Sequence, residues 1–193
     1  NEEISKLSGE QVFDAILKAN LFTYFRQRPF NVIPNHKVSP RDIFISGLNT
    51  GPLSVDIEVV MAGQLENFQN GINAISKLTK GNVYLTTKKN SILSSIENVK
   101  LNTISGPHPA GNVGIQIHHI SHLRPGEIVW TINPQAVATL GKFFKTGEYD
   151  PFRVISFGGP CAKNPSYYKV RTGIPIKSLI HDNLKSENVR IIS

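Results

Sequence analysis

Short apolar segments with the spacing of strands alternate with segments that have the spacing of helices, and this alternation constrains the fold more than any other feature. Residues 42–46, 83–85 and 99–104 are short apolar segments bounded by turn residues, which is typical of buried strands. Residues 56–78 carry apolar side chains at helical spacing, with Gly63 as a candidate break, and residues 91–96 predict a helical turn. Strands that alternate with helices predict an α/β fold, a parallel sheet covered by helices.

Further segments have the start and stop signals of helices. Ser8 and Gln11 have the spacing of a capping box, so we expect a helix over 9–19, followed by a turn over 21–26. Apolar spacing predicts a helix that starts near Val113, and residues 127–130 predict a strand. The pair Asn133-Pro134 predicts a helix start, and Gly147 predicts its end.

The pattern changes near Asp150. Residues 153–157, 167–170 and 189–192 have the composition of strands, and 175–180 predicts a short helix, a ββαβ order. We therefore expect one domain over 1–149 and a second, small module over 150–193. Because its last strand lacks a partner, we expect the chain to be an internal fragment of a longer protein.

Composition excludes several classes of function. The single Cys161 excludes an internal disulfide and a cysteine-ligated iron–sulfur cluster within this chain. No apolar run is long enough to cross a bilayer and no signal peptide is present, so we expect any membrane role to be peripheral. The net charge of +7 favours an acidic partner, but the basic residues are spread along the sequence and match no nucleic-acid motif. His118, His119 and His122 lack a nearby carboxylate, so we predict no metal site.

The segment Ser105–Gly114 follows a predicted strand and precedes a predicted helix, where ligands bind in open α/β sheets. Its candidate ligand residues are Gly106, His108, Gly111 and Gly114. Backbone N–H groups at a helix start suit phosphates. The segment lacks the Lys-Ser/Thr of a P-loop and the first glycine pair of a dinucleotide fingerprint. Two interpretations stay open, a vestigial nucleotide loop and a bend that lets a helix pack closely on the sheet.

A second candidate site lies in a proline-containing segment, residues 25–37. A flat head group with carbonyl oxygens could lie on its apolar side chains and accept hydrogen bonds from its Arg or His. The alternative is a surface loop whose phenylalanines fill the core. The candidate residues are Phe25, Arg28, Phe30, Val32, Ile33, His36 and Lys37.

Four blocks of sequence resemble the alpha subunit of the sodium-translocating NADH:quinone reductase (Na+-NQR), in that family's order. They are residues 106–114, 25–30, 142–148 and 163–165. Pro109-Ala110-Gly111 is also similar to a motif of the flavin-bearing NADH-binding subunit of respiratory complex I and of the RnfC protein of the Rnf complex. The resemblance implies a Rossmann-like domain followed by a partial ubiquitin-like module (SLBB, a β-grasp fold). Residues 172–180 resemble the start of that module.

The resemblance also implies a function. Residues 1–51 lack the glycine-rich flavin loop of the relatives, so we expect no cofactor in this chain, with the flavins and the iron–sulfur centre in other subunits. The implied role is a peripheral subunit of the reductase at the cytoplasmic face of the bacterial inner membrane, partnered by a membrane subunit and without catalytic residues of its own. Ubiquinone or menaquinone is the implied substrate, and residues 30–37 match the family's proposed quinone contacts. The alternative is a docking module without quinone or nucleotide contact.

Overall fold

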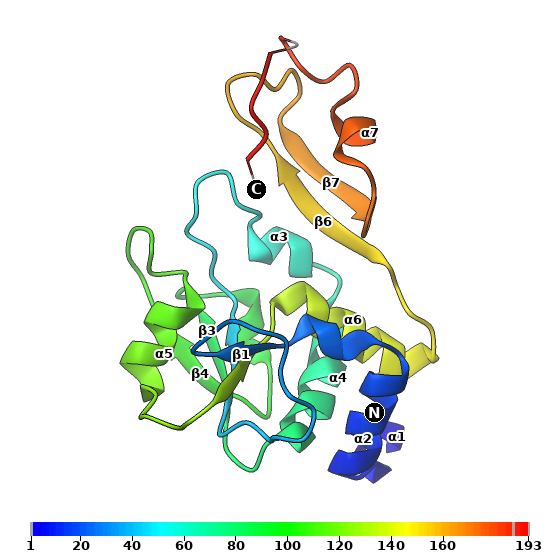
Figure 1. Ribbon diagram of the computed structural model, residues 1–193, viewed down its shortest axis with the longest axis vertical. Helices are drawn as coiled ribbons and strands as arrows, with labels where there is room; N and C mark the ends of the chain where they lie inside the picture. Colours follow the sequence, from blue (N-terminus) through cyan, green and yellow to red (C-terminus); the bar gives the residue numbers. More distant parts are fainter. Residues whose placement is uncertain (1, 187, 193) are drawn as a thin grey trace. The chain divides into compact units, whose positions relative to one another are not determined.

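The chain divides into two units in the computed structural model, which describes residues 2–186 and 188–192 (Figure 1). The first, here called the α/β unit, contains the residues up to Thr50 together with Asp56–Asp150. The second, here called the hairpin unit, contains Gly51–Val55 and the residues from Pro151 onward.

A five-stranded sheet in the order β1-β5-β2-β3-β4 forms the α/β unit. Strands β5, β2, β3 and β4 run parallel to one another, which confirms the predicted α/β fold. The edge strand β1 pairs antiparallel with β5 and was not predicted from the sequence. The strands are β1 (Arg26–Arg28), β2 (Ile43–Ser46), β3 (Val83–Thr87), β4 (Lys100–Thr103) and β5 (Val129–Thr131).

Six helices and three 3-10 turns accompany these strands in the described part of the unit. The capping box of Ser8 is present, with both of its hydrogen bonds, at the start of α2. The helical pattern over 56–78 is interrupted at Gly63, whose φ of 76° ends one helix before the next begins. The helices are α1 (Glu2–Lys6), α2 (Gly9–Lys18), α3 (Ile57–Met61), α4 (Leu65–Ile75), α5 (Val113–Ser121) and α6 (Pro134–Thr146), and the turns are η1 (Leu21–Tyr24), η2 (Ser76–Leu78) and η3 (Ile92–Ser95).

Both faces of the sheet are covered. Phe44 and Val129 pack against Ile117 of α5 on one face. Alternation along β2 turns Ile43 and Ile45 to the opposite face, where both are fully buried. Figure 1 shows α5 on one side of the sheet and α4 and α6 on the other. Because neither face meets water, the central strands consist of apolar runs rather than alternating residues.

Two glycines bring α4 and α6 into close contact. A Cβ atom on Gly71 would lie 2.0 Å from the carbonyl oxygen of Val137, and one on Gly141 would lie 1.7 Å from that of Asn67. Any larger residue at these positions would push the helices apart. Gly71, which weakens α4 as an isolated helix, is therefore required by the packing.

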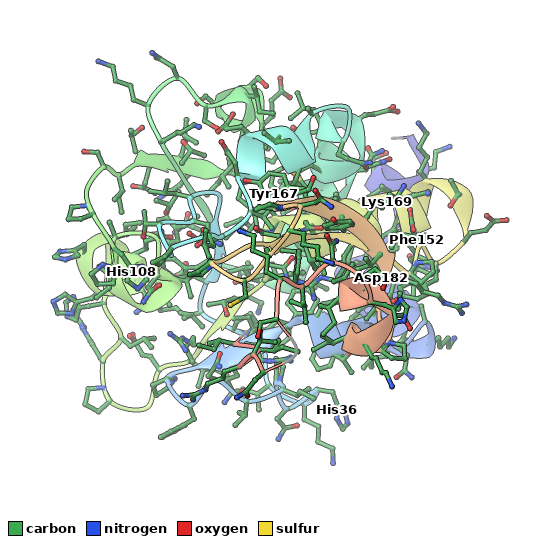
Figure 2. All side chains as sticks on the ribbon, turned by 90° about the horizontal axis from the view of Figure 1, so that it is seen from above. His36, His108, Phe152, Tyr167, Lys169 and Asp182 are labelled. Carbon is green, nitrogen blue, oxygen red and sulfur yellow. The ribbon has the colours of Figure 1, made fainter. Side chains whose placement is uncertain are left out.

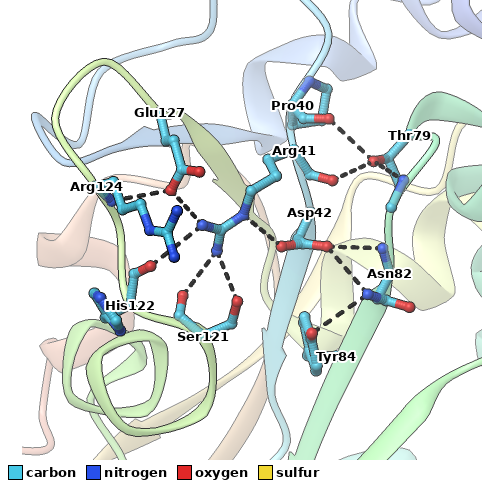
Figure 3. A network of polar contacts seen from close by, with 11 residues as sticks. Pro40, Arg41, Asp42, Thr79, Asn82, Tyr84, Ser121, His122, Arg124 and Glu127 are labelled. Atoms are coloured by element: carbon cyan, nitrogen blue, oxygen red, sulfur yellow. Dashed lines mark hydrogen bonds and ion pairs between the residues drawn. The ribbon is translucent and has the colours of Figure 1, made fainter.

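Arg41, two residues before β2, connects the N-terminal end of this strand to the end of α5 (Figure 3). Its guanidinium pairs with Asp42 at 2.7 Å and with Glu127. It also donates to the carbonyl oxygens of Ser121 at 2.8 Å and His122 at 3.2 Å, where a cation satisfies the last carbonyls of a helix. Partial burial acts to lower the pKa of Arg41, but the two carboxylates outweigh it and raise that pKa.

The hairpin unit contains an antiparallel pair, β6 (Phe152–Phe157) and β7 (Ser166–Arg171), followed by α7 (Ile176–Ile180). These elements agree with the predicted strand, strand and helix. The predicted strand over 189–192 was wrong, since these residues form no strand. A strand requires a hydrogen-bonded neighbour, and none of the described residues pairs with this segment.

We expect Gly141→Ala to destabilise the protein by about 3 kcal/mol, because the new methyl group meets backbone atoms that cannot move alone. Urea unfolding followed by circular dichroism measures the change. At an unobstructed helical position the same substitution stabilises by about 0.5–1 kcal/mol. A stabilised Gly141→Ala variant would therefore contradict the described contact.

A second expectation concerns acid. A hydrogen bond from the backbone N–H of Arg124 lowers the pKa of Glu127 from its ordinary 4.5, and the charge of Arg41 lowers it as well. Desolvation acts in the opposite direction but is outweighed. A lowered pKa means that the ionised group stabilises the fold above pH 4.5 and that this contribution is lost as the pH falls further. Glu127→Gln should be less stable than the parent at pH 7, and the difference should shrink below pH 4.5. Urea unfolding across this range, with Glu148→Gln as the exposed control, tests it; a difference that does not vary with pH would refute it.

Candidate functional site

Ser46, the last residue of β2, fixes the start of α5. Its Oγ lies 2.8 Å from the carbonyl oxygen of Leu48 and 3.0 Å from that of Gly111. The side-chain amide of Gln116 donates to the same Oγ at 2.8 Å and to the carbonyl oxygen of Ala110 at 3.2 Å. The segment before α5 is thereby tied to the carboxyl end of the central strand.

Thr50 makes a second connection between these two loops. The N–H of Gly111 donates to Thr50 Oγ1 at 2.9 Å, and His108 Nδ1 lies 3.3 Å from the same oxygen. A Cβ atom on Gly111 would lie 2.6 Å from the backbone nitrogen of Thr50. Gly111 is therefore needed for a close approach of two backbones, and its N–H group already has a partner.

Arg28 of β1 reaches the first turn of α5. A Cβ atom on Gly114 would lie 2.8 Å from its Nη2 atom. The structure thus brings together one residue from each of the two predicted sites. In the described part of the chain, no carboxylate lies within ion-pair distance of Arg28.

The loop that follows β1 exposes large apolar side chains. Backbone hydrogen bonds between Gln27 and Val32, at 2.7 and 3.3 Å, close the loop at its base. Phe30 is 79% exposed, Val32 49% and Ile33 53%. His36 and Lys37 are also exposed. Figure 2 shows His36 well separated from His108. The two predicted sites are therefore in contact at Arg28 and Gly114, while these two histidines lie apart.

Phe25 lies elsewhere. Its side chain is fully buried and packs against Trp130, with 5.5 Å between the ring centroids, and against Phe22 at 5.8 Å. It is therefore a core residue. For this one phenylalanine the alternative interpretation of the segment, a ring that fills the core, describes the structure.

Sequence reasoning did not identify Ser46, Thr50 and Gln116, which hold the site together. Gln116 is buried and its Oε1 atom has no hydrogen-bond partner among the described residues. None of the three belongs to a motif. Only the position of Ser46 at the end of a predicted strand pointed to this edge of the sheet.

Metal and membrane-spanning features are absent from the residues that the structure describes. No three His, Cys, Asp or Glu side chains gather there to hold a metal ion, although the rings of His118 and His119 touch. No described helix is both long enough and apolar enough to cross a bilayer.

Two family models match the chain. Residues 7–149 match "NqrA second alpha/beta domain", and residues 154–193 match "NQRA C-terminal domain", a model that carries the SLBB label. A solved structure of an NAD+-reducing [NiFe]-hydrogenase in the H2-reduced state is 14% identical with a TM-score of 0.58 and covers 94% of this chain and 42% of its own. At that identity the hydrogenase shows the fold alone.

Curated relatives match this chain over nearly its whole length. The NqrA subunits of the Na(+)-translocating NADH-quinone reductases are 35% identical in Marinomonas sp. (strain MWYL1), over 99% of this chain, and 36% identical in Pasteurella multocida (strain Pm70), over 100% of it. The matched region is 43% and 44% of those relatives, so the chain spans less than half of their length. On the family models and these identities, the chain belongs to the NqrA family, the alpha subunits of the Na(+)-translocating NADH-quinone reductase.

Proposed function

We propose that the chain is part of a cofactor-free, peripheral subunit of a sodium-pumping NADH:quinone oxidoreductase, and that its loop over 29–37 contributes to the contact with quinone. The relatives carry the name of this reductase, which supports the role within the complex. The observation that supports the quinone contact is the exposure of Phe30, Val32 and Ile33 on one short loop.

The exposed apolar side chains of this loop can contribute binding free energy. Burying one Phe or Ile side chain contributes about 2 kcal/mol, and most of this remains available at the exposed Phe30. A quinone head group is flat and apolar on both faces, so it can lie against such side chains. Single exposed apolar residues are ordinary on protein surfaces, whereas three within four residues form a patch.

Polar groups beside the patch suit the rest of a quinone. Its two carbonyl oxygens accept hydrogen bonds, and a reduced quinone carries negative charge or protons. Arg28, just before the loop, and His36 and Lys37, within it, supply donors. Arg28 also lies beside Gly114 at the N-terminus of α5, which is the positive end of that helix.

We propose that the segment before α5 now serves packing rather than nucleotide binding. The N–H of Gly111 already donates to Thr50, and the two backbones touch there. A phosphate group would need that N–H group and that space. On this proposal Gly106, His108, Gly111 and Gly114 descend from a nucleotide loop, and other subunits hold the flavins and the iron–sulfur centre.

We expect a photoreactive ubiquinone, irradiated in the complete reductase, to label residues within 29–37. Val32→Ser should reduce the label because it removes apolar surface from the loop. Val59→Ser is the matched control, since Val59 is 59% exposed on α3 and Val32 is 49% exposed. Tandem mass spectrometry of the digested subunit locates the adduct.

Kinetics provide a second test of the loop. Phe30→Ala should raise the KM for quinone about tenfold, corresponding to about 1.4 kcal/mol of lost apolar contact, while NADH oxidation with an artificial acceptor stays unchanged. No adduct within 29–37 together with an unchanged KM would favour the alternative, a docking module without quinone contact.

The packing role of the second segment makes a separate prediction. Calorimetric titration of the chain with NADH or with FMN should release no binding heat, and the purified chain should show no flavin absorbance. A saturable heat that Gly111→Val abolishes, with the fold retained by circular dichroism, would instead establish a working nucleotide site.

A further inference from the structure

The hairpin unit carries most of the net positive charge of the chain. Residues 51–55 and 151–193 contain seven Lys and Arg and two Asp and Glu, a net charge of +5, while the whole chain has +7. About a quarter of the residues thus hold most of the excess charge. Charge concentrated in this way attracts an acidic surface and speeds its association.

The two faces of the hairpin differ in burial. Cross-strand pairs place Ile155 opposite Tyr168 and Arg153 opposite Val170 on one face. Val170 is buried there. The hydroxyl of Tyr168 accepts a hydrogen bond from Asn183 at 2.9 Å. This inner face packs against the rest of its own unit.

The opposite face, here called the outer face, combines aromatic and cationic side chains. Phe152 is 49% exposed and Tyr167 40%, and Lys169 and Arg171 are exposed as well. Arg171 lies directly opposite Phe152, and Lys169 Nζ lies 5.5 Å from the centre of the Phe152 ring. Figure 2 labels three of these residues on the hairpin. The outer face consists of Phe152, Val154, Ser156, Tyr167, Lys169 and Arg171.

The described part of the chain does not neutralise these two cations. No described carboxylate lies within ion-pair distance of Lys169 or Arg171. The acid described in this unit, Asp182, pairs with His181 at 2.9 Å. Among the described residues, both cations are therefore left without a carboxylate partner.

We propose that the outer face docks an acidic surface of another polypeptide, with carboxylates against Lys169 and Arg171 and an apolar side chain against Phe152. Arg binds carboxylates through two parallel hydrogen bonds, and Arg and aromatic residues are enriched in protein interfaces. Lipid attraction requires clusters of about 4–8 cations, whereas the outer face has two. The inference rests on the proposed role as one subunit of a larger complex.

Charge reversal in the complete reductase tests the proposal. Lys169→Glu with Arg171→Glu should weaken retention of the subunit on the purified complex about tenfold, with dissociation at lower NaCl concentration, because like charges then meet across the interface. Lys177→Glu with Arg190→Glu is the matched control, since it makes the same change of charge at exposed positions off the outer face. The control should be retained like the parent, and so should Lys169→Arg with Arg171→Lys.

Zero-length crosslinking identifies the partner. A carbodiimide should join Lys169 to an Asp or Glu of another subunit, located by mass spectrometry. Thermal unfolding should show equal Tm values for all variants, because the substituted residues are exposed. Binding of the subunit to phosphatidylglycerol vesicles tests the alternative occupant of the outer face, a lipid surface.

Three outcomes would overturn the proposal. The first is equal retention of both charge-reversed variants, and the second is crosslinks from Lys169 only within its own chain. The third is loss of vesicle binding by the variant with Lys169→Glu and Arg171→Glu while that variant stays in the complex. Quinone labelling of residues 29–37 is read separately, so a failure here does not imply a failure of the proposed quinone contact.

Discussion

The position of α5 depends on one strand that holds the helix at both ends. Arg41, just before β2, binds the last carbonyl oxygens of α5, and Ser46 at the end of β2 holds the segment before its first turn. Between them Phe44 packs against Ile117. Charged hydrogen bonds hold one end of α5, neutral hydrogen bonds hold the other, and apolar contact lies between them. Together these interactions fix the position of α5 on the sheet. That position brings its first turn against Arg28 and so determines the environment of the candidate site.

Local signals in the sequence predicted much of this fold. Capping by Ser8 and Asn133 and the apolar runs of β2 and β3 act within a few residues, and the structure confirms the elements that they predicted. Non-local pairing was harder to predict. Strand β1 is three polar residues that become a strand only because β5 lies beside them, and residues 189–192 form no strand because no described neighbour pairs with them. Gly71 is an unfavourable helix residue until α6 is placed against it.

In the candidate site, too, some features follow from local sequence and others only from the tertiary structure. The sequence grouped Phe25 with Phe30, and only the tertiary structure decides that one ring fills the core while the other is 79% exposed. Thr50 and Gln116 belong to no motif, so their contacts with the segment before α5 could not be foreseen. Basic residues look evenly spread along the sequence, but the hairpin unit holds most of the excess of basic over acidic residues. The pairing of β6 with β7 sets two basic residues beside an aromatic ring. In this protein, composition indicates an excess of positive charge, and folding determines the surface on which that charge lies.

The role proposed for this chain depends on contact between quinone and the exposed loop over 29–37 within the assembled reductase. A cryo-electron microscopy map of the complete complex with bound quinone tests it most directly. We expect density for the head group within about 4 Å of Phe30, Val32 or Ile33, the distance of apolar contact. Quinone density elsewhere, with this loop packed against another subunit, would refute the proposed contact and favour a docking module in its place.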